Sequence, residues 1–182
     1  STSEIKTTHL GLSTSLQTGA WQHSAGLSYG HQRYANTRPI PVGATMRIVT
    51  GQSDGAAYEL SLKSYLDLAK LNGTSDGALS YGPVFGLDWT RTRRNAYSET
   101  GAGILNLDVA SATMTQAKAR LGFAGSVSRR MNRTKVTLNG LLAVEHHFAD
   151  ISATSVATLP ITGQQFISRS APIERNRAVL GL

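Results

Sequence analysis

A strict alternation of bulky and small side chains runs through residues 79–91, LSYGPVFGLDWTR. A period of two residues is the pattern of a β-strand, whose successive side chains point to opposite faces. One face of this strand is bulky and aromatic, and the other is small or polar with a single carboxylate, Asp88. In a soluble sheet the bulky face would form the core. In a transmembrane barrel it would face lipid, and the small face would line a wet lumen.

The same alternation predicts further strands, each with one small or polar face. A helix is the alternative for residues 57–69, but the leucines there repeat every second residue, which favours a strand. Together with residues 79–91, about seven strands are visible. The others cover residues 8–16, 21–34, 57–69, 117–127 and 136–148, and a last strand contains Ala178, Leu180 and Leu182.

Short and long connections alternate between these predicted strands. Short turns are expected near Gln17, Leu71 and Arg129, the last being a basic turn that extends to Arg133. Long loops are expected at residues 35–55, which also contain strand-like extensions, after Arg94 as a flap or hairpin, and at residues 150–173 as an irregular loop. Outer-membrane barrels have short turns at one rim and long loops at the other. The predicted strands also exceed the five or six residues usual in soluble sheets. The predicted fold is therefore all-β, an antiparallel up-and-down transmembrane β-barrel.

Aromatic residues fall near the ends of the predicted strands. Aromatic side chains gather at both membrane interfaces of such barrels. We expect Trp21 and Tyr81 to lie near the rim with short turns, and Tyr58, Trp89 and Phe148 near the rim with long loops.

Composition narrows the class of protein. The 182 residues suit one domain, and 18 glycines with only 16% charged residues suit an all-β chain. No run approaches the 18 or so apolar residues of a membrane helix, so a membrane-spanning form would be a closed barrel. The net charge of +7 raises the possibility of nucleic-acid binding. We expect no nucleic-acid partner, because the Lys and Arg clusters at residues 91–94 and 129–133 have no interleaved aromatics.

Charges of both signs lie on the face predicted to line the lumen. In one interpretation they form a solvated, internally paired lining in which no single residue is essential; in the other, some of them contact a peptide threaded through the pore. The predicted lumen residues are Glu59, Lys63, Asp88, Lys118, Arg120 and Glu145, with Asp67, Lys135 and either Arg175 or Arg177 as further members.

No catalytic, cofactor-binding or metal-binding residue is predicted. The esterase motif Gly-Asp-Ser-Leu does not occur. His146 and His147, near Glu145 and Asp150, form the one suggestive cluster, but adjacent strand residues point to opposite faces and do not share a ligand. Two alternatives stay open. One is an outer-membrane barrel hydrolase with its site in the loops near Asn95 and Asp150. The other is a soluble lipocalin-like binding barrel with its bulky side chains inside.

Several stretches resemble the translocator β-domain of bacterial autotransporters. They are residues 81–103 (YGPVFGLDWTRTRRNAYSETGAG), residues 105–128 (LNLDVASATMTQAKARLGFAGSVS) and residues 16–34 (LQTGAWQHSAGLSYGHQRY). Residues 53–68 (SDGAAYELSLKSYLDL) and 156–166 (VATLPITGQQF) more closely resemble barrels attached to GDSL-type esterases.

The resemblance implies an outer-membrane barrel of type V secretion that anchors an N-terminal passenger and exports or displays it through the pore. The implied partners are the passenger or its linker helix, the barrel-assembly machinery and membrane lipid. Glu59, Asp88, Lys118 and Arg120 would contact the linker. Any esterase activity would belong to a passenger, so the barrel itself is expected not to be an enzyme. Family barrels have twelve strands and usually end in an aromatic residue. We therefore expect residues 1–182 to be a single barrel domain lacking its first and last strands and any passenger.

Overall fold

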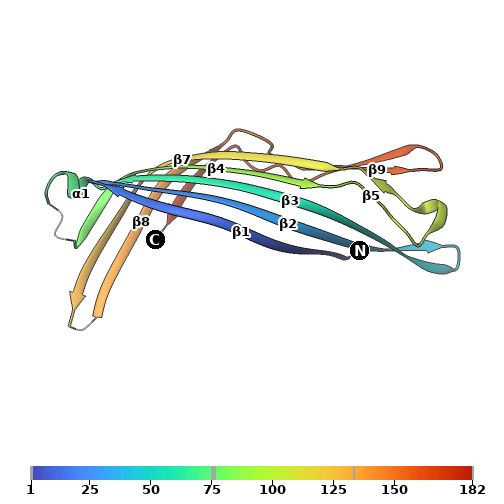
Figure 1. Ribbon diagram of the computed structural model, residues 1–182, viewed down its shortest axis with the longest axis horizontal. Helices are drawn as coiled ribbons and strands as arrows, with labels where there is room; N and C mark the ends of the chain where they lie inside the picture. The colour runs from blue at the N-terminus through green and yellow to red at the C-terminus, as the bar shows by residue number, and fades with distance from the viewer. Residues whose placement is uncertain (1, 75–76, 133, 182) are drawn as a thin grey trace.

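The computed structural model describes residues 2–74, 77–132 and 134–181, and these are almost entirely β. Seven antiparallel strands form one curved sheet, and each pairs with its neighbours in chain order, β1-β2-β3-β4-β7-β8-β11 (Figure 1). The predicted count of about seven wall strands is confirmed. Their bounds are β1 Thr2–Thr18, β2 Trp21–Val42, β3 Thr45–Leu66, β4 Leu79–Arg94, β7 Ala112–Met131, β8 Thr134–His147 and β11 Asn176–Gly181.

The sheet is open, with β1 and β11 at its two sides, and its strand ends form two contrasting edges (Figure 1). We call the edge with the β1–β2, β3–β4 and β7–β8 connections the turn edge. The opposite edge, the loop edge, carries the β2–β3 hairpin and the β4–β7 and β8–β11 connections. The assignment of connections to the two edges agrees with the sequence, except that the β2–β3 connection is a short turn and not a long loop.

Residues 35–55 are not a long loop, and that prediction was wrong. β2 and β3 continue through them, pair as far as Val42 and Thr45, and turn at Gly43, which has a φ of 60°. Pro39 and Pro41 suggested a break in the strand, because proline removes a ladder donor. Both prolines nevertheless lie within the β2–β3 ladder, Pro39 opposite Ile48 and Pro41 opposite Met46.

The strand predicted for residues 57–69 is confirmed as far as Leu66, but its last residues form a different element. Asp67 leaves the sheet and caps a single helical turn, α1 Leu68–Leu71, by accepting the Lys70 N–H at 3.2 Å. The Asp67 side chain, which the sequence placed in the lumen, is buried beside this cap. It also accepts a hydrogen bond from the Ser80 hydroxyl at 2.8 Å, which ties the β3–β4 connection to β4.

The long connections at the loop edge contain regular structure. The expected flap after Arg94 holds β5 Tyr97–Ser98, a 3₁₀ turn Gly103–Leu105 and β6 Asp108–Val109. The loop at residues 150–173 is not irregular, because it forms a hairpin of β9 Thr154–Leu159 and β10 Gln164–Arg169. These four strands make a second sheet in the order β10-β9-β6-β5.

This second sheet is attached to the inner side of the β2–β3 hairpin. The Arg38 guanidinium donates to the Glu99 carboxylate, and Thr50 and Thr100 form a bridge with N···O distances of 2.9 and 2.8 Å. Val49 beneath them is 1% exposed. The loop edge is therefore a packed structure.

Two further predictions concern residues beside the ends of the described ranges. Arg129, placed in a basic turn by the sequence, belongs to β7, which runs to Met131; Arg133 of that turn lies outside the described residues. Ala178 and Leu180 lie in β11 as expected, and Leu182 also lies outside the described residues.

Candidate functional site: the polar face of the sheet

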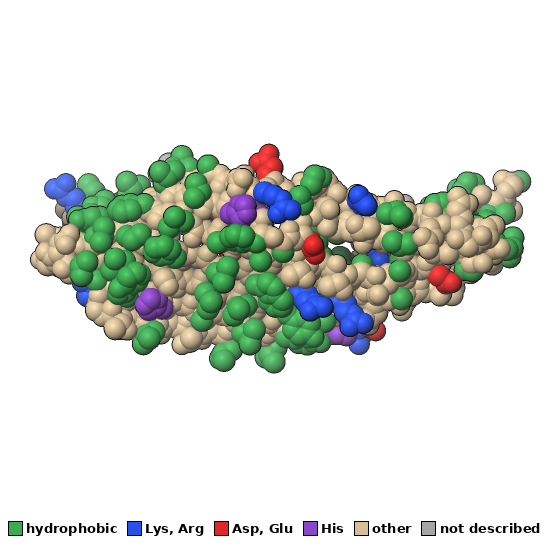
Figure 2. Space-filling model, turned by 90° about the horizontal axis from the view of Figure 1, so that it is seen from above, with side chains coloured by type: hydrophobic (Ala, Val, Ile, Leu, Met, Phe, Trp, Pro, Cys, Tyr) green, Lys and Arg blue, Asp and Glu red, His purple; other side chains and the backbone are tan. Residues whose placement is uncertain are grey.

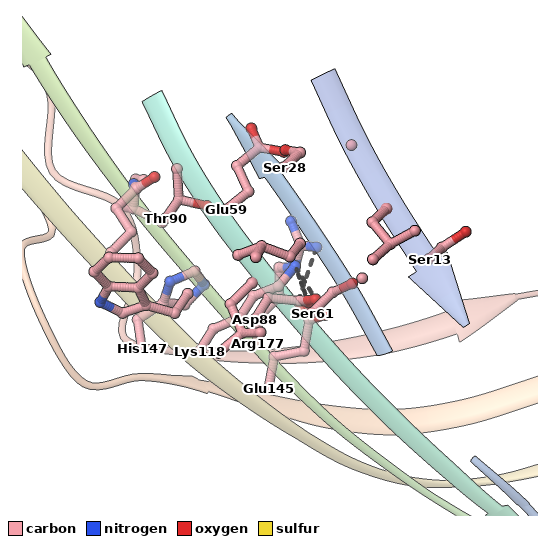
Figure 3. Close-up of a pocket in the computed structure, with 18 residues that line it drawn as sticks. Ser13, Ser28, Glu59, Ser61, Asp88, Thr90, Lys118, Glu145, His147 and Arg177 are labelled. Carbon is pink, nitrogen blue, oxygen red and sulfur yellow. Dashed lines mark hydrogen bonds and ion pairs between the residues drawn. The ribbon is translucent and has the colours of Figure 1, made fainter. Parts of the chain in front are cut away.

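The register of the seven strands brings small and charged residues into rows on one face. Because paired residues in adjacent strands point to the same side, each row can be followed across the sheet. One row is Ser13, Gly26, Ser61, Asp88, Lys118 and His147; the next is Ser15, Ser24, Lys63, Gly86, Arg120, Glu145 and Arg177. Both rows line the hollow of the sheet, and Figure 3 shows the first row together with Glu145 and Arg177 of the second.

Glu145 is the centre of an ion-pair network on this face. Its side chain is fully buried, and Arg120 donates to it through Nε at 2.8 Å and also through a terminal nitrogen. Arg177 reaches its second oxygen at 3.0 Å, and Lys118 lies 3.7 Å away. Lys118 is also 3.5 Å from Asp88, so one chain of alternating charges crosses from β4 to β11 (Figure 3).

The other two predicted lumen residues are less constrained. Glu59 is exposed and accepts one hydrogen bond, from Ser28 at 3.0 Å. Lys63 lies on the same face between Ser24 and Gly86, and forms no ion pair with a described residue. The structure thus gathers Asp88, Lys118, Arg120 and Glu145 into one network and leaves Glu59 and Lys63 available for another partner.

Close packing explains why so many residues on this face are small. Gly122 of β7 lies against Ala143 of β8, and a Cβ on Gly122 would come 2.6 Å from the Leu142 carbonyl oxygen. Ala143 itself is 3% exposed. Larger residues at these positions would force the two strands apart, so the alternation with glycine and alanine is a packing requirement.

The opposite face is apolar and uncovered. Leu10, Leu12, Leu27, Leu142 and Val144 are each 60–78% exposed, although they lie in the middle of regular strands. Figure 2 shows hydrophobic side chains spread over the broad part of the molecule. The soluble lipocalin-like alternative requires these side chains on the inner face, which is the reverse of the observed arrangement.

The five predicted interface aromatics occupy defined levels along the strands. Trp21 is the first residue of β2 and Tyr81 the third of β4, both close to the turn edge. Tyr58 lies eight residues from the end of β3 at the turn edge, Trp89 lies five residues from the end of β4 at the loop edge, and Phe148 directly follows β8. Tyr29, which sequence reasoning did not select, pairs with Tyr58, and their ring centroids are 5.3 Å apart.

The histidine cluster at residues 146–147 is divided between the two faces. His146 pairs with Ala119 on the apolar face, where its Nδ1 is 2.6 Å from Asn176 Oδ1. His147 pairs with Lys118 on the polar face. No group of three or more His, Asp or Glu residues in the described ranges is arranged to hold a metal ion. No helix in the described part of the chain is long and apolar enough to cross a membrane.

Arg177 and the Arg38–Glu99 pair show the limits of sequence reasoning here. Arg177 was one of two candidates for the lumen, and the structure distinguishes it from Arg175, which donates to the His147 carbonyl at 3.3 Å. Arg38 and Glu99 were missed, because both were assigned to loops. Neither residue stands in an apolar stretch or an alternating pattern, so no local signal identified the pair.

A comparison with family models gave one match, and the search of curated proteins gave none. The model of the autotransporter beta-domain matches residues 1–182, the whole of the chain. This family consists of β-barrel translocators of type V secretion in the bacterial outer membrane, in agreement with the antiparallel sheet, its two contrasting edges and its uncovered apolar face. The chain belongs to the autotransporter beta-domain family.

Proposed function

We propose that these seven strands form much of the wall of an outer-membrane pore through which a passenger polypeptide is exported or displayed. The observation that carries the proposal is the two-faced sheet. Its uncovered apolar face suits contact with lipid, and its hollow face is lined with hydroxyls, glycines and paired charges. A lining of this kind keeps water in a pore and offers many weak contacts to a moving chain, so no single strong site would hold the chain back.

The two less constrained lumen charges are the best candidates for contact with a linker segment. Glu59 and Lys63 project into the hollow without the pairing that holds Arg120. Asp88 and Lys118 are about a third exposed, so they can also share their charges with a second partner. We therefore assign contact with a linker to Glu59, Lys63, Asp88 and Lys118, and a mainly structural role to Arg120 and Glu145.

The test is surface display in intact bacteria. An epitope-tagged reporter placed ahead of the barrel sequence is expected to be accessible to antibody and protease on whole cells. A barrel that resists unfolding in cold detergent while its reporter remains in the periplasm would contradict the proposal. Glu59→Gln with Lys63→Gln should slow the appearance of the reporter without changing barrel yield, and Ser15→Ala on the same face is the matched control.

A further inference from the structure

On the apolar face of β1 to β4, the first charged side chain lies the same number of residues from the turn edge in each strand. Between the turn edge and this level, no outward position in the described parts of β1 to β4 carries Asp, Glu, Lys or Arg. Lys6, Arg33, Asp54 and Arg91 each lie twelve residues from the strand residue at the turn edge, which is Thr18, Trp21, Leu66 and Leu79 respectively.

Twelve residues are enough to cross the hydrocarbon core of a membrane. At about 3.3 Å per residue and a tilt of about 45°, they rise roughly 28 Å, close to the ~30 Å of a hydrocarbon core. In all four strands the first outward charged residue lies the same number of residues from the turn edge. A solvated surface gives no reason for this agreement, whereas a lipid boundary does, because charged side chains are costly inside the hydrocarbon core. Outer-membrane barrels have short periplasmic turns and longer external loops, so we place the loop edge outside, and this boundary then lies in the outer leaflet.

Two arginines at this boundary differ from the other charges because they have no ion-pair partner among the described residues. Lys6 lies 3.3 Å from Glu4, and Arg33 lies 3.8 Å from Asp54. Arg91 and Arg93 are exposed and form no ion pair or side-chain hydrogen bond with any described residue. They project from the same face of β4, about 6.6 Å apart along the strand, so their guanidinium groups can converge on one anion.

The neighbours of these arginines are mainly hydrogen-bond donors. Thr115 lies opposite Arg91 and Thr113 opposite Arg93, and Tyr58 lies on the other side of Arg91. The nearby carboxylates are engaged elsewhere. Asp54 is 3.6 Å from His31, and Asp150 accepts the Thr115 N–H at 2.8 Å.

We propose that Arg91 and Arg93 bind the phosphate of an anionic lipid headgroup in the outer leaflet, with Thr113, Thr115 and Tyr58 as hydroxyl donors. The inference rests on the proposed membrane orientation. Charge complementarity supports it, because unpaired guanidinium groups bind phosphate oxygens through two parallel hydrogen bonds. Figure 2 shows Lys and Arg side chains gathered beside the hydrophobic area, on the side toward the loop edge.

The experiment compares lipid binding by the refolded protein in mild detergent, using native mass spectrometry with bisphosphorylated lipid A as the probe. The wild-type protein is expected to bind this lipid A more tightly than the fully dephosphorylated form. Arg91→Ala with Arg93→Ala should weaken the binding of the phosphorylated probe about tenfold or more. Arg91→Lys with Arg93→Lys should retain part of it, because the charge remains but the fork geometry is lost.

The matched control is Arg129→Ala, which removes an exposed outward arginine at the turn edge and should leave binding within twofold. Equal binding by the wild-type protein and the double alanine variant would overturn the proposal. So would equal binding of both lipid forms, or full competition by millimolar inorganic phosphate, which would show a site for free phosphate. A protein that displays its reporter yet lacks the lipid preference would refute this inference alone.

Discussion

At the scale of single residues, Glu145 is the side chain whose replacement should be most costly. Glu145→Gln keeps the shape but removes the charge that Arg120 and Arg177 share, so we expect a loss of about 2 kcal/mol in the free energy of unfolding. Urea unfolding of the protein in lipid vesicles measures this loss in the free energy of unfolding. Glu59→Gln, which alters an exposed carboxylate with one hydrogen bond, should change stability by less than about 0.5 kcal/mol.

Asp67 makes the β3–β4 connection sensitive to acid. Burial raises the pKa of its carboxyl, but hydrogen bonds from the Ser80 hydroxyl and from backbone N–H groups, including that of Lys70, outweigh burial and leave the pKa below 3.8. The charged form is therefore favoured by folding. Its contribution is complete above about pH 5 and is lost as the pH falls through 3.8 and then through the lower folded pKa.

Asp67→Asn should remove this pH dependence. Because a neutral amide accepts these hydrogen bonds less strongly than a charged carboxylate, we expect a loss of about 1 kcal/mol at pH 7 and a smaller difference from the wild-type protein near pH 3. Denaturant unfolding at both pH values measures the difference. A gap between the two proteins that stays constant with pH would show that the carboxylate charge has no role.

Sequence reasoning at this scale identified which face each side chain occupies but not which side chains meet. Strand geometry alone assigns Lys118, Arg120 and Glu145 to one face. Their pairing depends on the register between β7 and β8, which places Arg120 opposite Glu145, 25 positions later. Alternation within one strand contains no information about that register.

At the scale of elements, the β4–β7 connection should be held in place by backbone contact. Gly101 has a φ of 109°, and a Cβ there would overlap the Ile48 carbonyl oxygen. Gly101→Ala is therefore expected to detach this connection and raise its rate of cleavage by chymotrypsin about tenfold.

Gly163→Ala is the control for this prediction. Gly163 also has a positive φ, of 70°, but no described atom lies within 4 Å of the position that an alanine methyl would take there. Cleavage between Asn95 and Ser111 should therefore stay slow. Equal cleavage in the two variants would mean that backbone strain in general, and not the contact with Ile48, loosens the loop edge.

Some strands could be predicted from the alternation of their side chains and others could not. The strands at residues 79–91 and 117–127 were predictable because their alternation is unbroken. The β2–β3 extension was not, because Pro39 and Pro41 argue locally against a strand, although both lie within the β2–β3 ladder. β9 and β10 were missed because a six-residue strand in a polar stretch has little period to detect.

At the scale of the whole molecule, the two faces should respond differently to charge. Leu60→Arg puts a cation on the apolar face, six residues from the turn edge and so near the bilayer centre, at an expected cost of about 2–4 kcal/mol. Ser61→Arg puts it on the hollow face beside Asp88 and should cost less than about 1 kcal/mol. Urea unfolding in lipid vesicles measures the free energy of unfolding of both variants. Equal costs would contradict a lipid-facing surface.

The β2–β3 hairpin runs nine residues past Arg33 before it turns, roughly 30 Å of paired ribbon. On the proposed orientation it rises beyond the headgroups, so antibodies and bacteriophages would meet its tip before they met the cell surface.

Gly43 has no described atom near its Cβ position, so the turn has room for a foreign epitope. An epitope inserted after Gly43 should stain intact cells in flow cytometry, and an unstained cell with a folded barrel would mean that the hairpin points inward. If the inserted epitope is exposed as expected, this turn would be a site for displaying vaccine antigens.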